Sequence, residues 1–211
     1  MLLAEEEPVK VLEKCFGYTL FLWKQEEIIR HVLGKKHALV VAPTGIGKSL
    51  CYQIPAIIND DLTVVISPLI ALMKDQVDAL KRRGIDAAYI NSSLGREKRE
   101  TRYAALKNGG YRIIYVTPER FRKIDFTKAI AGRRISLLAV DEAHCISEWG
   151  HDFRPDYTRI REFRQVLGNP VTIALTATAT PEVQKDIIKT LSLEAGEVKI
   201  FHGGIDRPIC T

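Results

Sequence analysis

The sequence predicts a doubly wound α/β fold, in which a mostly parallel sheet carries helices on both faces. Short apolar runs alternate along the chain with segments of helical pattern. Most of these runs are apolar at every position, as in parallel strands that are buried on both faces. Polar motifs directly follow several of the runs, and a sheet of this kind binds its ligands beyond the carboxyl ends of its strands.

Each predicted strand leads into a predicted helix. Strands are expected at residues 38–41, 63–66, 87–90, 112–116, 137–140 and 171–175. The helices that follow them are expected at residues 48–58, 69–83, 96–107, 119–123, 157–167 and 181–191. Two more helices, 9–16 and 25–33, precede the first strand. We therefore expect N-terminal helices within residues 1–33, packed on a core domain of residues 34–202, and an exit strand or linker over residues 203–211.

The composition is that of an ordinary globular protein. The 211 residues are 46% hydrophobic and 27% charged, which argues against disorder and suffices for one buried core. The apolar runs are far shorter than the roughly 20 residues of a membrane-spanning helix. Three glutamates at residues 5–7 stand where a secretory signal would carry positive charge. We expect a soluble, intracellular protein without a membrane partner.

Charge and metal-ligand spacing are weaker guides. The net charge of +5 suits a polyanionic partner but does not prove one. The basic clusters are read first as solvated helix faces. The 4 cysteines and 5 histidines lack the spacing of zinc ligands. No structural zinc is expected, and the cysteines are expected to be reduced thiols.

The loop that follows the first predicted strand is the strongest candidate for a binding site. It reads APTGIGKS over residues 42–49. Its glycines allow successive N–H groups to close around phosphate oxygens, while Lys48 can reach the β- and γ-phosphates and Ser49 can ligate Mg²⁺. Because positive φ is costly for a β-branched residue, Ile46 is predicted to have negative φ. The alternative interpretation is an ordinary turn between a strand and a helix, without a ligand. The residues expected to contact the nucleotide here are Thr44, Gly45, Ile46, Gly47, Lys48 and Ser49.

An acidic pair after a later apolar strand complements this loop. The motif DEAH, residues 141–144, directly follows the run at residues 137–140. Asp141 would hold Mg²⁺ through its water shell, and Glu142 would orient or deprotonate the attacking water. Together the two motifs predict nucleoside triphosphate hydrolysis, with Lys48, Asp141 and Glu142 as catalytic residues.

Three hydroxyl-bearing motifs also follow predicted strands. They read SPL, TPE and TAT, at residues 67–69, 117–119 and 176–178. Ser or Thr followed by Pro is a good helix start. A helix N-terminus can also bind the phosphates of a nucleic-acid backbone, so both interpretations hold. The threonines of TAT alternatively cap a strand end.

With these motifs in order, the chain closely resembles the first RecA-like motor domain of RecQ-family DNA helicases, within helicase superfamily 2. The resemblance runs over residues 12–208. Its most specific stretch, DEAHCISEWGHDFR at residues 141–154, joins the acidic motif to an aromatic-rich loop that generic DEAD-box and DEAH-box RNA helicases lack. Further correspondences are the adenine-sensing motif at residues 17–25, SPLIALMKDQV at 67–77, TPER at 117–120 and ALTAT at 174–178.

The resemblance implies a role for each segment. Gln25 is the implied adenine reader, because an amide both donates and accepts, and Tyr18 either stacks on the base or fills the core. Trp149 and Phe153 either offer faces to unstacked bases or pack in the fold. The residues implied to contact DNA are Ser67, Thr117, Trp149, His151, Phe153 and Arg154. Those implied to couple hydrolysis to DNA engagement are His144, Thr176 and Thr178.

The implied activity is that of an ATP-dependent 3′–5′ DNA helicase. It would use ATP and Mg²⁺, act on single-stranded and duplex DNA in DNA repair and recombination, and reside with the DNA in the nucleoid or nucleus. Members of the family carry a second RecA-like domain whose arginine finger contributes about 10³ to 10⁵ in rate, so this chain alone is expected to be nearly inactive. An RNA-remodelling ATPase and a regulatory nucleic-acid-binding module without turnover are the alternatives.

The chain departs from the family pattern in the adenine-sensing motif. Leu22 stands where the family commonly has Arg, which puts ATP affinity in question. We hypothesise that Trp23 or Lys24 takes over the role of this arginine in ATP binding. Ile46 replaces the Gly, Ser or Ala of relatives, which we expect to be tolerated.

Overall fold

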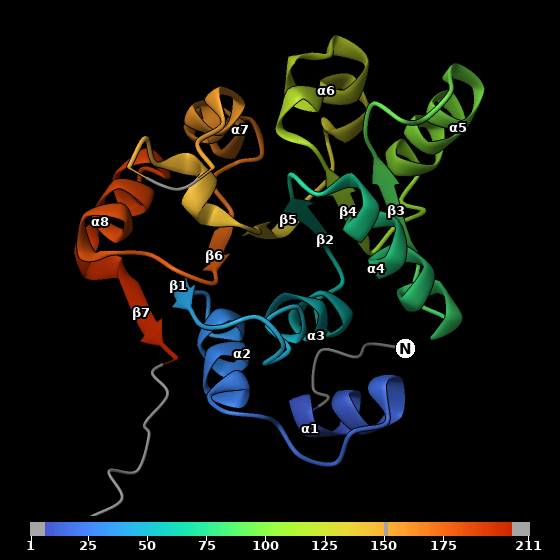
Figure 1. Cartoon of the computed structure of the whole chain (residues 1–211). Helices are drawn as coiled ribbons and strands as arrows, with labels where there is room; N and C mark the ends of the chain where they lie inside the picture. Colours follow the sequence, from blue (N-terminus) through green and yellow to red (C-terminus); the bar gives the residue numbers. More distant parts are fainter. Residues whose placement is uncertain (1–6, 150–151, 204–211) are drawn as a thin grey trace, which may run out of the picture.

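A seven-stranded, entirely parallel sheet forms the centre of the molecule. The structure is a computed structural model that describes residues 7–149 and 152–203, and within them the strand order is β3-β4-β2-β5-β6-β1-β7 (Figure 1). The strands are β1 (His37–Val41), β2 (Leu62–Ile66), β3 (Ala87–Ile90), β4 (Ile113–Val116), β5 (Ile135–Val140), β6 (Val171–Thr176) and β7 (Val198–His202).

Helices cover both faces of this sheet, as the sequence predicts. One face carries α1 (Pro8–Val11), the π-helical turn η1 (Leu12–Phe16), α2 (Gln25–Leu33), α3 (Leu50–Ile58) and α4 (Ile70–Arg82). The other carries α5 (Arg96–Lys107), η2 (Pro118–Arg122), α6 (Ile124–Ile130), η3 (Ala143–Ile146), η4 (Pro155–Arg159), α7 (Ile160–Val166) and α8 (Pro181–Thr190). A short 3₁₀ turn, η5 (Ala195–Glu197), precedes β7.

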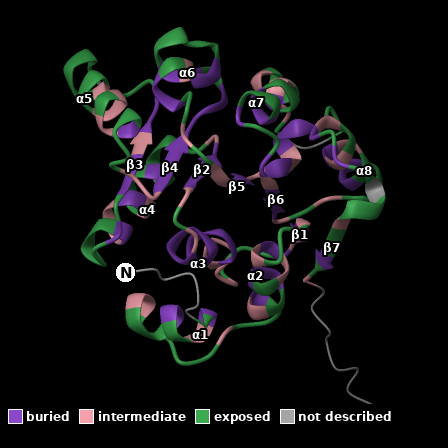
Figure 2. Ribbon diagram, turned by 180° about the vertical axis from the view of Figure 1, so that it is seen from behind, coloured by how far each residue is buried: buried purple, intermediate pink, exposed green. Residues whose placement is uncertain are grey.

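Side chains alternate between two apolar cores, one on each face. Along β5, Leu137 and Ala139 belong to the core under α3, whereas Leu138 and Val140 belong to the opposite core. This period of two is the geometric signature of a strand, and burial on both sides explains the unbroken apolar run. The doubly wound α/β prediction is therefore confirmed. Figure 2 shows α3 as the most completely buried of the helices.

Several predicted boundaries were wrong. The chain turns through Lys48 and Ser49, so α3 begins at Leu50 rather than at residue 48. Residues 118–122 form a 3₁₀ turn, and extended backbone at Lys123 separates it from α6, which was not predicted. The edge strand β7 was not predicted either, except as an exit segment. Of its residues Phe201 is buried, so the apolar pattern is weak.

The N-terminal helices pack on the same core as α3. The αL conformation of Gly17, with φ of 75°, ends the first helical segment, and a glycine adopts it without steric cost. Leu12 and Ile28 are fully buried in the core under α3. Residues 204–211, most of the predicted exit linker, lie outside the described residues. Within the described ranges, no helix is both long and apolar enough to cross a membrane.

Candidate active site

The strand order brings the two strongest motifs to one edge of the sheet. Strand β6 lies between β1, which leads into the phosphate loop, and β5, which leads into the acidic pair. Thr176 at the end of β6 bonds to both sides: its carbonyl accepts from Ala42 N at 3.0 Å, and its Oγ1 lies 2.9 Å from His144 Nδ1. A phosphate group held by the loop would therefore lie near the acidic side chains.

The phosphate loop has the backbone that a phosphate cradle requires. Gly45 and Gly47 adopt φ of 88° and 74°, where a side chain would be strained. At Gly47 a Cβ would also stand 2.6 Å from Gln25 Nε2, whereas at Gly45 it would meet no atom within 4 Å. Ile46 is absent from the positive-φ residues among those described, so its predicted negative φ is confirmed. The loop leaves open space beside Gly45.

Lys48 is folded back onto the start of its own loop. Its Nζ donates to Ala42 O at 2.6 Å and to Pro43 O at 2.9 Å. Burial lowers the pKa of Lys48, while the charges of Glu142 and Asp141 act in the opposite direction. The ammonium group is held near the carboxylates by neutral carbonyl oxygens, and charged phosphate oxygens would be stronger acceptors in their place. The phosphate loop and Lys48 therefore fit a nucleoside triphosphate.

Asp141 is an acid held in an unfavourable environment. Burial, reinforced by the charge of Glu142, raises its pKa from 3.8 to about 6, although Glu142 N donates to Asp141 Oδ1 at 3.1 Å and Lys48 lies nearby. A divalent cation would relieve this penalty. Among the described residues, no three His, Cys, Asp or Glu side chains gather as a metal site. Mg²⁺ held by Ser49 and Asp141 would thus take its remaining ligands from phosphate and water.

Glu142 stands in a strained backbone conformation. Its φ of 49° is in the left-handed region, which costs a non-glycine residue on the order of 1–3 kcal/mol and is typical of functional sites. Its Oε2 lies 3.3 Å from His144 Nδ1. This geometry holds the carboxylate next to the histidine and beyond the end of β5.

His144, Thr176 and Thr178 form one hydrogen-bonded chain. Thr176 Oγ1 donates to Thr178 O at 3.0 Å and accepts from Thr178 N at 3.4 Å. The same Oγ1 lies 2.9 Å from His144 Nδ1, so one hydroxyl links the histidine to Thr178. The structure brings these three predicted coupling residues together with Glu142. Their coupling role stays a prediction.

Gln25 is fully engaged by backbone groups. Its buried amide accepts from Leu22 N at 2.8 Å and donates to Ile46 O at 2.8 Å and Gly47 O at 3.1 Å. Both amide protons are used, so bidentate reading of an adenine edge requires release of one loop carbonyl. Gln25 thereby links the N-terminal segment to the phosphate loop.

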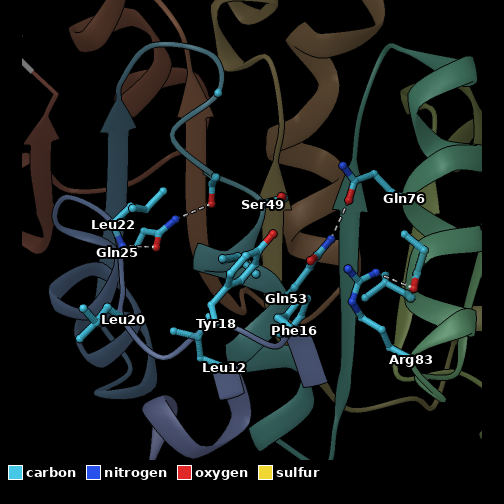
Figure 3. Close-up of a pocket in the computed structure, with 15 residues that line it drawn as sticks. Leu12, Phe16, Tyr18, Leu20, Leu22, Gln25, Ser49, Gln53, Gln76 and Arg83 are labelled. Carbon is cyan, nitrogen blue, oxygen red and sulfur yellow. Dashed lines mark hydrogen bonds between the residues drawn. The ribbon is translucent and has the colours of Figure 1, made fainter. Parts of the chain in front are cut away.

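A pocket of about 380 Å³ lies beside this link (Figure 3). Its walls include Tyr18, Leu20, Leu22, Gln25, Gly47 and Ser49. Tyr18 is 56% exposed, so it does not fill the core and its ring is free to meet a base. Trp23 and Lys24 are not among the described residues that line the pocket. Arg83, which directly follows α4, contributes its cationic side chain at the far end.

The predicted DNA contacts divide into exposed and buried residues. Trp149 is 80% exposed, which contradicts the alternative that it is packed. Phe153 is half-buried, and the Arg154 guanidinium is bound to Asp152 Oδ2 through Nη2 at 2.9 Å and Nε at 3.2 Å. The side chains of Ser67 and Thr117 are buried. His151 lies outside the described residues.

A buried polar network was missed by sequence reasoning. Gln53 Nε2 donates to Gln76 Oε1 at 2.7 Å and to Tyr115 OH at 3.1 Å, and Tyr115 OH donates to Tyr52 OH at 3.4 Å. It joins α3, which follows the phosphate loop, to α4 and to the strand that leads into TPER. The sequence signal that could have indicated this network is the amide of Gln53 in an otherwise largely apolar helix segment.

The comparisons with known proteins agree with this geometry. The family model described as DEAD/DEAH box helicase matches residues 24–187. The ATP-dependent DNA helicase RecQ of Bacillus subtilis (strain 168) is 51% identical over 186 residues, 87% of this chain and 32% of the relative. RecQ of Haemophilus influenzae is 46% identical over 200 residues, covering 95% and 32%.

A solved structure shares the fold. The Pyrococcus furiosus Hef helicase domain aligns with a TM-score of 0.64 at 22% identity, over 87% of this chain and 40% of that chain. The chain spans about a third of the length of the two RecQ relatives. Both relatives are named as ATP-dependent DNA helicases. With a family match over most of its length and RecQ helicases at about half identity, the chain belongs to the DEAD/DEAH box helicases and is a helicase domain of the RecQ type.

Proposed function

We propose that this chain is the ATP-binding motor domain of an ATP-dependent DNA helicase that moves 3′ to 5′ on single strands and unwinds duplexes. The observation that supports this most is the position of Thr176 between the phosphate loop and the acidic pair, with hydrogen bonds to both sides. Nucleotide binding at the phosphate loop can thereby influence the acidic pair through a single residue.

The hydrolytic roles follow from the contacts at the sheet edge. The N–H groups of the phosphate loop and Lys48 bind the nucleotide phosphates, and Lys48 exchanges the carbonyls of Ala42 and Pro43 for phosphate oxygens. Ser49 and Asp141 would hold Mg²⁺, which would neutralise phosphate charge when bound. Glu142 orients or deprotonates the attacking water. Tyr18 and Gln25 bind the adenine at the pocket beside the loop.

The DNA contacts extend from the same sheet edge. Trp149 presents an exposed ring to unstacked bases, and Arg154 can exchange Asp152 for a phosphate. Phe153 and His151 are further proposed DNA contacts, and Ser67 and Thr117 are proposed to contact the DNA backbone. His144, Thr176 and Thr178 couple the two activities.

Turnover requires a second RecA-like domain of the full-length chain. Its arginine finger would close the ATP site, so the present chain alone is expected to be nearly inactive. The protein would act inside the cell, with the DNA. An RNA-remodelling ATPase and a regulatory module without turnover remain as rivals, although Lys48, Asp141 and Glu142 are all present.

The decisive experiment measures ATPase activity of the full-length gene product with single-stranded DNA, with RNA and with neither. We expect stimulation by DNA alone, and a fall of about 10² to 10⁴ in the Glu142→Gln variant. Glu97→Gln on the exposed side of α5 is the matched control and should leave the rates unchanged. Equal rates under the three conditions refute the proposal, and stimulation by RNA alone favours the first rival.

A further inference from the structure

The pocket of about 380 Å³ beside the phosphate loop has two sides. Figure 3 shows Tyr18 in its middle, with Leu22 and Gln25 on one side and Gln53 and Gln76 on the other. The side with Gln25 belongs to the proposed nucleotide site, whereas the side toward α4 has no role in that proposal. We call this second side the amide compartment, and its lining residues are Phe16, Gln53, Gln76, Ala79, Leu80 and Arg83.

Two amide side chains form the polar wall of the amide compartment. Gln53 Nε2 donates to Gln76 Oε1 at 2.7 Å and to Tyr115 OH at 3.1 Å, so both of its protons are used. Gln53 Oε1 and Gln76 Nε2 have no hydrogen-bond partner in the described part of the chain, and neither is one of its fully enclosed unpaired atoms. The wall therefore offers an open acceptor next to an open donor.

This wall is held in place before any ligand arrives. Gln53 is 4% exposed and is bonded to the buried Tyr115, whose hydroxyl donates in turn to Tyr52 OH at 3.4 Å. Because these contacts already fix the amide of Gln53, a ligand that binds it does not have to order it, and preorganised groups of this kind favour binding.

The remaining walls of the amide compartment are mostly apolar or aromatic. Leu80 is buried, and the half-buried Phe16 carries the Arg83 guanidinium over its ring at 5.4 Å from the centroid. Tyr18 is exposed and borders the compartment, so its ring is available for stacking. An apolar pocket with a few fixed polar groups is the usual form of a small-molecule site.

We propose that the amide compartment binds a second ligand, an aromatic carboxamide, at the same time as the nucleotide. The carboxamide N–H would donate to Gln53 Oε1, its carbonyl would accept from Gln76 Nε2, and its ring would pack on the apolar walls. A carboxylate on the same ring lacks the N–H and would set a charged oxygen against Gln53 Oε1, while an unsubstituted ring would leave both amides unpaired. This inference rests on the proposed function, which assigns the nucleotide to the other side of Tyr18.

The test titrates benzamide into the full-length protein, with and without saturating Mg²⁺ and ADP, by saturation-transfer NMR. A Kd on the order of 1 mM is expected for a ligand of this size, and benzoate should bind about tenfold more weakly. Gln76→Glu keeps the oxygen that accepts from Gln53 and removes the free donor, so benzamide affinity should fall about tenfold. Gln165→Glu, exposed on α7, carries the same charge change as a matched control and should leave benzamide affinity unchanged.

A second variant does not depend on the amides. Ala79→Leu would fill part of the amide compartment from α4 and should also abolish benzamide binding. Both variants should keep the ADP affinity within about twofold of the wild type, and their melting temperatures show that they are folded.

Each other outcome overturns the inference. Absent benzamide binding, or equal affinity for benzamide and benzoate, refutes the carboxamide as the ligand class. Unchanged benzamide affinity in either folded variant shows that the probe binds elsewhere. Displacement of benzamide by ADP shows that the compartment is part of the nucleotide site and holds no second ligand. Failure of ADP itself to bind the wild type refutes the proposed function instead, and the titration without ADP separates these two failures.

Discussion

The raised pKa of Asp141 predicts that a catalytic residue destabilises its own domain. At about 1.4 kcal/mol per pH unit, the interval from 3.8 to about 6 corresponds to about 3 kcal/mol, an upper bound because the carboxylate is partly exposed. The folded protein binds the Asp141 proton more tightly than the unfolded chain does. Above pH 6 both states are ionised and the penalty is complete, whereas below about pH 4 both are protonated and it vanishes.

The isosteric variant Asp141→Asn should therefore be more stable than the wild type at pH 7.5. We expect a gain of about 2–3 kcal/mol in urea unfolding with a chelator and no nucleotide, shrinking to near zero as the pH falls from 6 to 4. The Asn carbonyl can still accept from Glu142 N. Asp75→Asn, exposed on α4, is the control. A difference between Asp141→Asn and wild type that is independent of pH, or a loss of stability at pH 7.5, would refute the reasoning.

Two further substitutions probe the loop and the DNA-binding surface. Gly47→Ala should cost roughly 1–3 kcal/mol in unfolding free energy, because φ is 74° and its Cβ would stand 2.6 Å from Gln25 Nε2. The control Gly95→Ala should cost far less unfolding free energy, because Gly95 has negative φ and open space around its Cβ position. Adding Gln25→Ala should restore part of the unfolding free energy that Gly47→Ala removes. Strictly additive effects of the two substitutions would contradict the predicted clash. Trp149→Ala should leave unfolding within about 0.5 kcal/mol but weaken single-strand affinity about tenfold by fluorescence titration. Ile124→Ala, equally a substitution of an exposed apolar residue, should not affect that affinity, and an unchanged affinity in Trp149→Ala removes the stacking role.

Motif positions were predictable because they depend on local rules. Parallel strands that are buried on both faces must be apolar throughout, and their carboxyl ends share one edge, so the motifs after β1, β4 and β5 could be assigned to one edge without coordinates. The negative φ of Ile46 follows from β-branching alone. By contrast, α6 and β7 lack strong periodicity, and their positions depend on neighbours that are distant in sequence.

Partners of individual side chains depended on the order of the strands. The sequence alone determined the fold class, the phosphate loop and the acidic pair, because backbone sterics and apolar periodicity act within a few residues. Only the tertiary structure decided that Thr176 stands between these motifs, that Gln25 bonds to the phosphate loop, and that the buried Tyr157 hydroxyl has no hydrogen-bond partner in the part of the chain that the structure describes. These contacts join residues brought together by sheet topology and packing, and no local pattern records which strand will lie beside which.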